Sequence, residues 1–426
     1  MSRRRPPPQP TQSSPSRTEQ PDQDEEEEQI QHSLLSVSTT TTTTSRAGFL
    51  IPSFYNTTFS CHRVSPLHNI SPIATELFSP ARLDQLAQRL RDRLVGDVVR
   101  GVEVGLVAAD ANGEDGGAMG GKQGALEGVE VRLVGVGEIV GLREQEEHDD
   151  DEKCVVISLR YENAQGTGIL FPGNRREGIL ERGDTRFFLG GGDLMDLDVD
   201  QALRLPLLLL RMPAPLKGVV AEFLQTEFDC RVSAMRLGSR SITRCWERWV
   251  GRSSAWEGLA KDVVVTVGFN AAALAAAEEG KEEGEQSKVQ QGLGIKTIDV
   301  IIPGTEVKRF EKAGKRIAQH KNVGGWEGDL KRRRELAGRL REEGWEWRLE
   351  EGTDKQPFTE ALGRYLRQHT AIDLFHPAVR VVKIACGGFV IAEQRLKIFK
   401  PGGEEQRRAA WELLGEIIEK AEVTTV

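Results

Sequence analysis

The sequence has little cysteine and no long apolar run. Its five cysteines are irregularly spaced along 426 residues and form no CxxC pair, so a disulfide framework is not expected. The apolar segment LPLLLL at 205–210 is far shorter than the ~18 residues that a membrane-spanning helix needs. The amino terminus is basic but lacks the apolar stretch of a secretory signal. These absences predict a soluble intracellular protein with reduced thiols.

Positive charge is not in excess either. The chain carries 57 bases against 65 acids, which gives a formal net charge of −8. A stand-alone DNA-binding module normally shows a basic excess. The overall balance therefore argues against such a module, although it is compatible with local basic patches.

Motifs that carry catalysis or hold a metal are also missing. Residues 116–123, GGAMGGKQ, have the GxxxxGK spacing of a phosphate-binding loop, but Gln123 stands where Ser or Thr would bind Mg²⁺. Cys61, His62 and His68 match no closed zinc pattern. Cys61 and His62 would also point to opposite faces of a strand, because neighbouring side chains alternate. We therefore expect no catalytic residue, no cofactor, no metal and a non-enzymatic role.

Composition divides the chain into a tail and a folded region. Residues 1–46 are rich in Pro, Ser, Thr, Gln and runs of acids, and their lack of apolar residues predicts a disordered tail. Residues 47–426 are expected to fold. Low-complexity insertions are expected in this region at 110–127, 144–153 and 271–291.

Apolar periodicity in 47–426 predicts both helices and strands. Ser79 as N-cap, Pro80 and a stripe of leucines predict a helix that ends at Gly96. Gly387-Gly388 predicts a hairpin over 378–399, with glycine at the positive φ that primed turns need. Other helices are expected at 213–228, 245–262, 304–320, 326–343, 357–370 and 403–421. Other strands are expected near 54–59 and at 98–108, 128–135, 154–161, 229–237, 263–269 and 294–302. Short strands joined by long loops favour an antiparallel meander in an α+β fold.

Three stretches carry a resemblance to a known family. They are FYNTTFSCHRVSPLH at 54–68, FLQTEFDCRVSAMRL at 223–237 and VRVVKIACGGFVIAEQRLKIF at 379–399, the last followed by an amphipathic helix. Together they resemble the fungal form of centromere protein L over roughly 48–421. These motifs are apolar and turn patterns, and none is a catalytic signature.

The resemblance implies a fold and a role. The implied fold is α+β, with a curved, largely antiparallel β-sheet that carries helices on one side. The implied role is that of a non-enzymatic subunit of the inner kinetochore, in the nucleus at the centromere. Such a subunit forms a heterodimer with a centromere protein N homologue. With other inner-kinetochore subunits, the pair supports attachment to the centromeric nucleosome and chromosome segregation, without any membrane contact.

The terminal hairpin is the candidate interaction site. Near a sheet edge, its unpaired backbone groups would extend the sheet of a partner; the alternative is that the hairpin is internal. The expected partner-binding residues are Val382, Ile384, Phe389 and Ile391. Candidates for contact with the DNA backbone are the basic residues Arg380, Lys383, Arg395 and Lys397. The alternative function is therefore that of a nucleic-acid-binding protein that uses the curved sheet.

Overall fold

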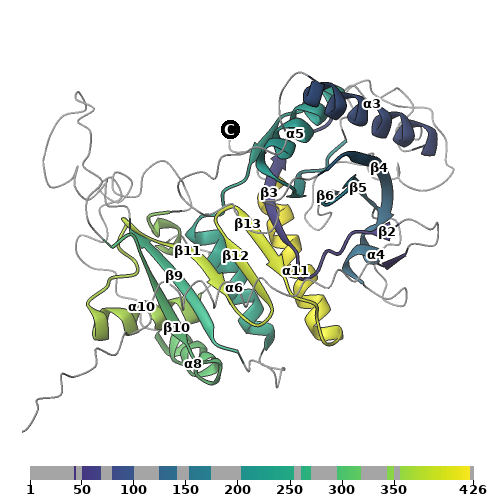
Figure 1. Ribbon diagram of the computed structural model, residues 1–426. Helices are drawn as coiled ribbons and strands as arrows, with labels where there is room; N and C mark the ends of the chain where they lie inside the picture. Colours follow the sequence, from purple (N-terminus) through teal and green to yellow (C-terminus); the bar gives the residue numbers. More distant parts are fainter. Residues whose placement is uncertain are drawn as a thin grey trace, which may run out of the picture. The chain divides into compact units, whose positions relative to one another are not determined.

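The structure analysed is a computed structural model of the 426-residue chain. The residues that it describes are 43–44, 50–68, 79–99, 124–141, 153–173, 203–253, 261–269, 295–317, 343–349 and 356–422. Within them, helices and one large antiparallel sheet form an α+β fold, as expected from the sequence (Figure 1).

The sheet has 11 strands among the described residues, in the order β10-β9-β11-β12-β13-β3-β7-β6-β5-β4, with β8 paired to β3. Every pairing within it is antiparallel. The strands are β3 (Thr58–Val64), β4 (Leu126–Gly135), β5 (Lys153–Tyr161), β6 (Gln165–Phe171), β7 (Leu207–Arg211), β8 (Val232–Ala234), β9 (Val263–Phe269), β10 (Thr297–Ile302), β11 (Val379–Ala385), β12 (Phe389–Ala392) and β13 (Arg395–Ile398). A separate two-stranded sheet consists of β1 (Thr43–Thr44) and β2 (Leu50–Ile51).

Helices pack on both faces of the sheet. The α-helices are α3 (Pro80–Val99), α4 (Val136–Val140), α5 (Ala214–Phe228), α6 (Ser239–Ser253), α8 (Val307–Ile317), α10 (Pro357–Thr370) and α11 (Glu404–Glu422), and the 3₁₀ turns are η2 (Gly304–Glu306) and η4 (Glu346–Leu349). Figure 1 shows α6 and α11 behind β11, β12 and β13, whereas α3 and α5 lie at the other end of the sheet.

The alternation of side chains along each strand creates two cores. In β3, Phe59 and Cys61 belong to the larger core, together with side chains of α6, α10 and α11. Val64 belongs to the smaller core, which is formed with α3 and α5. The smaller core contains no residue of β9–β13. Among the described residues, side chains pack on both faces of the sheet from β3 to β4, but on only one face from β10 to β13.

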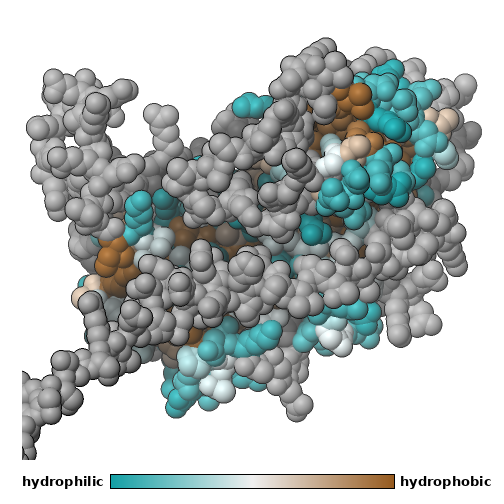
Figure 2. All heavy atoms as spheres, in the orientation of Figure 1, coloured by the Kyte–Doolittle hydropathy of each residue, from teal (hydrophilic) through white to brown (hydrophobic). Residues whose placement is uncertain are grey.

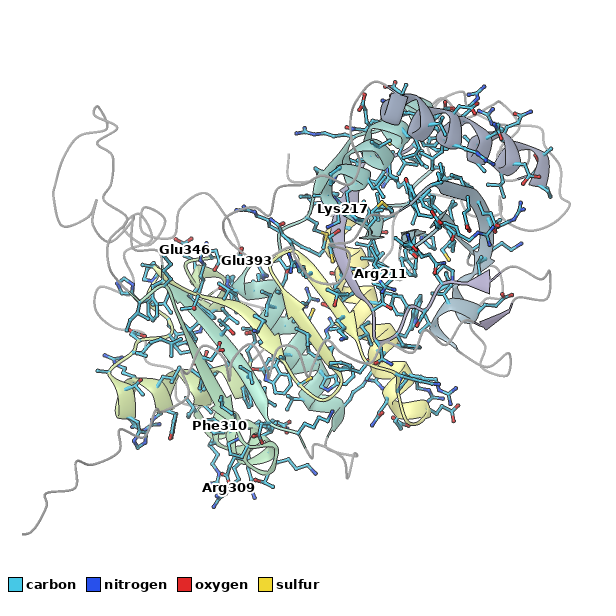
Figure 3. The ribbon with its side chains drawn as sticks, in the orientation of Figure 1. Arg211, Lys217, Arg309, Phe310, Glu346 and Glu393 are labelled. Carbon is cyan, nitrogen blue, oxygen red and sulfur yellow. The ribbon has the colours of Figure 1, made fainter. Side chains whose placement is uncertain are left out.

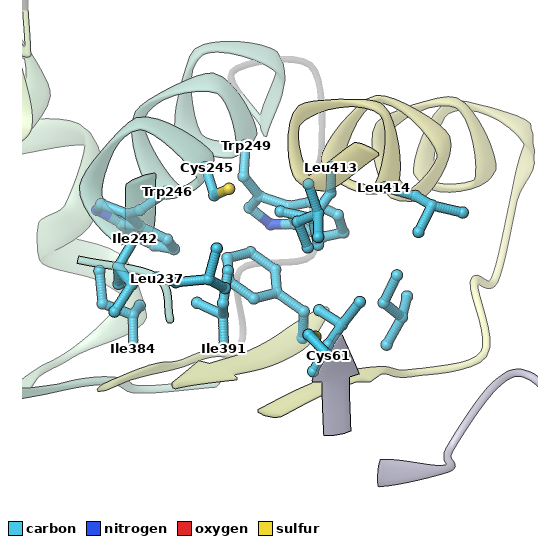
Figure 4. Close-up of a cluster of buried hydrophobic side chains, with 14 of the residues drawn as sticks. Cys61, Leu237, Ile242, Cys245, Trp246, Trp249, Ile384, Ile391, Leu413 and Leu414 are labelled. Atoms are coloured by element: carbon cyan, nitrogen blue, oxygen red, sulfur yellow. The ribbon is translucent and has the colours of Figure 1, made fainter. Parts of the chain in front are cut away.

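The larger core includes several buried aromatic side chains. Trp246 and Trp249 of α6 are 1% and 5% exposed, and Figure 4 shows them above Ile384 and Ile391 of the sheet. Trp246 contacts Phe358 of α10 edge-to-face, with ring centroids 5.2 Å apart. The expectation that these tryptophans are core residues is confirmed, while Trp256 lies outside the described residues.

Several sequence expectations agree closely with the structure. Leu83, Leu86, Leu90 and Leu94 are buried on one face of α3, and the Ser79 hydroxyl accepts a hydrogen bond from the Arg82 backbone N–H at 3.3 Å. The strands expected at 263–269 and 294–302 pair as a hairpin. The last two expected helices correspond to α10 and α11.

Other expectations need correction. Helix α3 continues past Gly96 to Val99, so the strand expected at 98–108 begins inside a helix and the rest of it lies outside the described residues. The strand expected at 229–237 is reduced to β8. The LPLLLL segment contributes β7, which is buried on both faces and therefore lacks polar alternation. The strand β6 was not expected.

The terminal hairpin has the expected two-residue loop, but for another reason. Cys386 donates its backbone N–H to the Phe389 carbonyl at 2.9 Å, and neither Gly387 nor Gly388 adopts positive φ. Instead, a Cβ at Gly388 would collide with the indole ring of Trp249. Glycine at 388 is required by the close approach of this tryptophan.

The helix expected at 304–320 is confirmed in part, as η2 followed by α8. The helix expected at 326–343 lies outside the described residues, except for Glu343. The expected tail, residues 1–46, also lies outside the described residues, except for β1. The three expected insertions lie outside the described residues too, except for residues 124–127 and 153.

Candidate interaction surface

At β9–β13, the face of the sheet opposite the larger core carries basic side chains, and no described helix packs on it. In β11 and β13, Val381, Ile384, Leu396 and Ile398 are buried in the larger core. Alternation directs the side chains of the four basic residues that the sequence singled out to the opposite face. They are Arg380, Lys383, Arg395 and Lys397, and all are partly or fully exposed. The structure thus brings these four residues together on one face.

The four expected partner-binding residues are placed differently. Ile384, Phe389 and Ile391 are 1%, 0% and 0% exposed and pack in the core. Val382 is half-buried at an irregularity between Val381 and Lys383. The hairpin lies inside the sheet, because β11 pairs with β9 and β13 pairs with β3. Its backbone is therefore not at an edge, and the role of these residues in partner binding stays a prediction.

The cations of the basic face differ in their surroundings. Arg380 Nη1 lies 3.9 Å from Glu393 Oε1, a long and partly exposed ion pair that contributes little to stability. Burial lowers the pKa of Lys397, and the nearby positive charge of Arg211 lowers it further. The ammonium of Lys397 lies 5.2 Å from the centre of the Phe399 ring. Lys397 of the basic face therefore lies within electrostatic reach of a second cation, Arg211.

Three further basic residues, His62, Arg211 and Lys217, lie near this face, and sequence reasoning missed them. Burial lowers the pKa of His62 to about 4, and the charge of Lys217 on α5 contributes to this shift. Burial also lowers the pKa of Arg211. Figure 3 shows Arg211 and Lys217 near the middle of the sheet. Only Arg211 had a signal in the sequence that could have revealed it, because it is the first charged residue after the apolar run LLLL.

Arg211 and Lys397 have no carboxylate partner among the residues that the structure describes. Both residues are half-buried. The charge of Arg211 is near enough to lower the pKa of Lys397, and burial removes part of the water that would solvate the two cations. An anionic group bound between them would relieve both costs. The arrangement therefore suits recognition of an anion such as a phosphate.

The strand β10 forms a free edge of the sheet, since it pairs only with β9 among the described strands. Phe269 donates its backbone N–H to the Lys296 carbonyl at 3.0 Å. Hydrogen-bonded pairs alternate in an antiparallel ladder, so Thr297, Asp299 and Ile301 direct their backbone groups away from β9. The Ile301 side chain is 64% exposed. Within the described part of the chain, this edge has backbone groups without a strand partner beside an exposed apolar side chain.

The residues considered as a metal or nucleophile cluster are separated. Cys61 is buried in the larger core, where burial raises its thiol pKa to about 12. His62 lies on the opposite face, 3.1 Å from the Ser60 hydroxyl, and His68 is exposed. Within the described segments, no group of three or more Cys, His, Asp or Glu side chains could hold a metal ion. No described helix is long and apolar enough to cross a membrane.

The described residues define a class of protein, namely an α+β protein with one large open sheet that has a basic face and an edge strand. The family model described as centromere protein L matches residues 53–422. The chain therefore belongs to the centromere protein L family, and its role is that of a structural kinetochore subunit at the centromere in the nucleus. No curated protein matches the chain.

Proposed function

We propose that this chain forms a heterodimer with a centromere protein N homologue and that the pair supports attachment of the inner kinetochore to the centromeric nucleosome and chromosome segregation. Membership of the centromere protein L family supports a kinetochore partner. The observation that carries the proposal is the free edge of β10. A partner strand that adds to this edge gains main-chain hydrogen bonds, and Ile301 offers an apolar contact beside them.

Replacing Ile301 by proline is expected to abolish pairing with the centromere protein N homologue. Proline removes the outward N–H that a partner strand needs, but no hydrogen bond to β9, so the chain itself should still fold. Co-expression and co-purification of the two chains measures the effect. The matched control is Ile301→Ala, which keeps the N–H and should retain the partner.

Two results would contradict the pairing through β10. One is full recovery of the partner with Ile301→Pro. The other is equal loss with both variants, which would assign the effect to the side chain and not to strand addition. Failure of the unaltered chain to capture any centromere protein N homologue would count against the heterodimer itself.

A second function, contact with the DNA phosphate backbone, is favoured by the Arg211–Lys397 pair. The double variant Arg211→Gln/Lys397→Gln should reduce the slope of log affinity against log salt by about 1.8, that is 0.9 for each lost phosphate contact. Fluorescence anisotropy with a labelled duplex at varied salt measures this slope. The control Arg91→Gln/Arg231→Gln removes two exposed charges elsewhere and should leave the slope unchanged. An unchanged slope in the Arg211/Lys397 variant would remove this function.

A further inference from the structure

The helix α8 carries an unusually basic outer face. Its sequence, VKRFEKAGKRI, has five bases and one acid, in a chain whose net charge is −8. All five bases are exposed, and they are Lys308, Arg309, Lys312, Lys315 and Arg316. Figure 3 shows Arg309 pointing outward from α8, and Figure 2 shows hydrophilic atoms gathered over the position of this helix.

Two of these cations are partly offset by carboxylates of the same segment. Arg309 bonds Glu306 at 2.9 and 3.0 Å, and Lys315 bonds Glu311 at 2.7 Å. The other three, Lys308, Lys312 and Arg316, have no carboxylate partner within the described part of the chain. They recur every four residues, so they form a row along one face with steps of about 6 Å. We call this set the α8 row.

Packing of the inner side of α8 fixes the direction of the α8 row. Val307, Glu311 and Gly314 are buried, and Phe310 packs on Phe358 and Tyr365 of α10 with ring centroids 5.6 and 5.5 Å apart. A Cβ at Gly314 would collide with the Pro357 carbonyl, so the two helices approach closely at that point. The helix cannot rotate to hide its charges without breaking these contacts.

The chemistry of this face favours a polyanion held by charge alone. Apart from Ala313, the exposed side chains of α8 are all cationic, so a protein segment would find no apolar anchor of the kind that dominates binding energy at protein interfaces. Duplex DNA needs no such anchor, because it presents one charge per ~1.7 Å of its axis and binding is driven by counterion release. We propose that the outer face of α8 binds the phosphate backbone of double-stranded DNA, with the α8 row as the contacting residues.

This surface is distinct from the basic face of the sheet and from the β10 edge. The helix α8 anchors through Val307 in the larger core, whereas the basic face lies on the opposite side of the sheet. The α8 row also contains no residue of β10. Loss of DNA binding through α8 can therefore be separated from loss of the heterodimer, and also from loss of contact through Arg211 and Lys397.

The test uses the full chain and a labelled duplex of mixed sequence. In the triple variant Lys308→Gln/Lys312→Gln/Arg316→Gln, the slope of log affinity against log salt should fall by about 2.7, which is 0.9 for each of three phosphate contacts. Between ~50 and ~200 mM salt, the unaltered chain should lose about 40-fold more affinity than the variant. The matched control is Arg91→Gln/Arg204→Gln/Arg231→Gln, which removes three exposed cations away from α8 and should behave as the unaltered chain.

Three outcomes would overturn the proposal. An unchanged slope in the α8 variant would show that the row does not meet phosphates. An equal reduction in the control would assign the effect to net charge. Unchanged DNA binding with loss of the co-purified protein partner would make the α8 row a contact for an acidic protein surface instead. The expected changes in slope, with the partner retained by all variants, support DNA binding through α8.

Discussion

Replacing Trp246 by alanine is expected to lower the free energy of unfolding by about 3–5 kcal/mol. The indole is 1% exposed, contacts Phe358 edge-to-face and lies 6.4 Å from the Phe389 ring, centroid to centroid. Truncation would leave a cavity where α6, α10 and β12 meet, and these aromatic neighbours are too constrained to fill it. Chemical denaturation with fluorescence or circular dichroism detection measures the change.

Trp246→Phe provides the control for this prediction. The indole N–H of Trp246 has no hydrogen-bond partner among the described residues, so phenylalanine removes no described hydrogen bond and leaves a smaller cavity. We expect it to cost clearly less than alanine. A loss below about 1 kcal/mol for Trp246→Ala would mean that the three elements collapse around the site, contrary to the close packing of the larger core.

Replacing Arg348 by alanine is expected to destabilise the fold by about 3–5 kcal/mol, because it breaks a buried ion pair by removing one partner. The Arg348 and Glu360 side chains are 15% and 10% exposed. The guanidinium donates three hydrogen bonds of 2.7–3.0 Å to the carboxylate. It also stacks on Phe375, with Cζ 3.3 Å from the ring centre. The change in the free energy of unfolding is measured as the shift in the denaturation midpoint multiplied by the dependence of that free energy on denaturant concentration.

The double variant Arg348→Met/Glu360→Leu tests the reason for this loss. Replacing both partners by apolar side chains removes the buried carboxylate together with its cation, so most of the stability should return. If the double variant is as unstable as Arg348→Ala, the cost comes from lost packing on Phe375. If Arg348→Ala has no effect, the carboxylate of Glu360 must find water or another partner when Arg348 is absent.

Elements with a clear period were predictable from the sequence. The helix α3 and the strand β11 each bury one face. The spacing of their apolar residues alone therefore indicates a helix in one case and a strand in the other. The same alternation explains why Arg380, Lys383, Arg395 and Lys397 lie on the face opposite the larger core. The β7 run LLLL gave no such signal, because a central strand buried on both faces has no polar alternation.

The neighbours of each strand could not be predicted in the same way. Nothing local in 378–399 shows that β13 pairs with β3 from the start of the fold, and this pairing is what makes the hairpin internal. The pair Arg211–Lys397 depends on the same arrangement of distant strands. The turn at Gly388 was predicted correctly from the sequence, but with positive φ as the reason for glycine. The actual reason is the close approach of Trp249, whose position is set by tertiary packing.

The place of β3 in the sheet has a consequence for how the chain is made. The strand pairs with β7 on one side and with β13 on the other, and Lys400 donates its N–H to Asn56 Oδ1 across 344 positions of sequence. While the chain emerges from the ribosome, β3 can pair with β7 and, at His62–Val64, with β8, but β13, which pairs with residues 58–60, does not yet exist. During this interval an open strand edge faces the crowded cytosol, where such edges promote aggregation. Protein synthesis must reach nearly the last element before the sheet is continuous, so prematurely terminated chains are natural clients for chaperones.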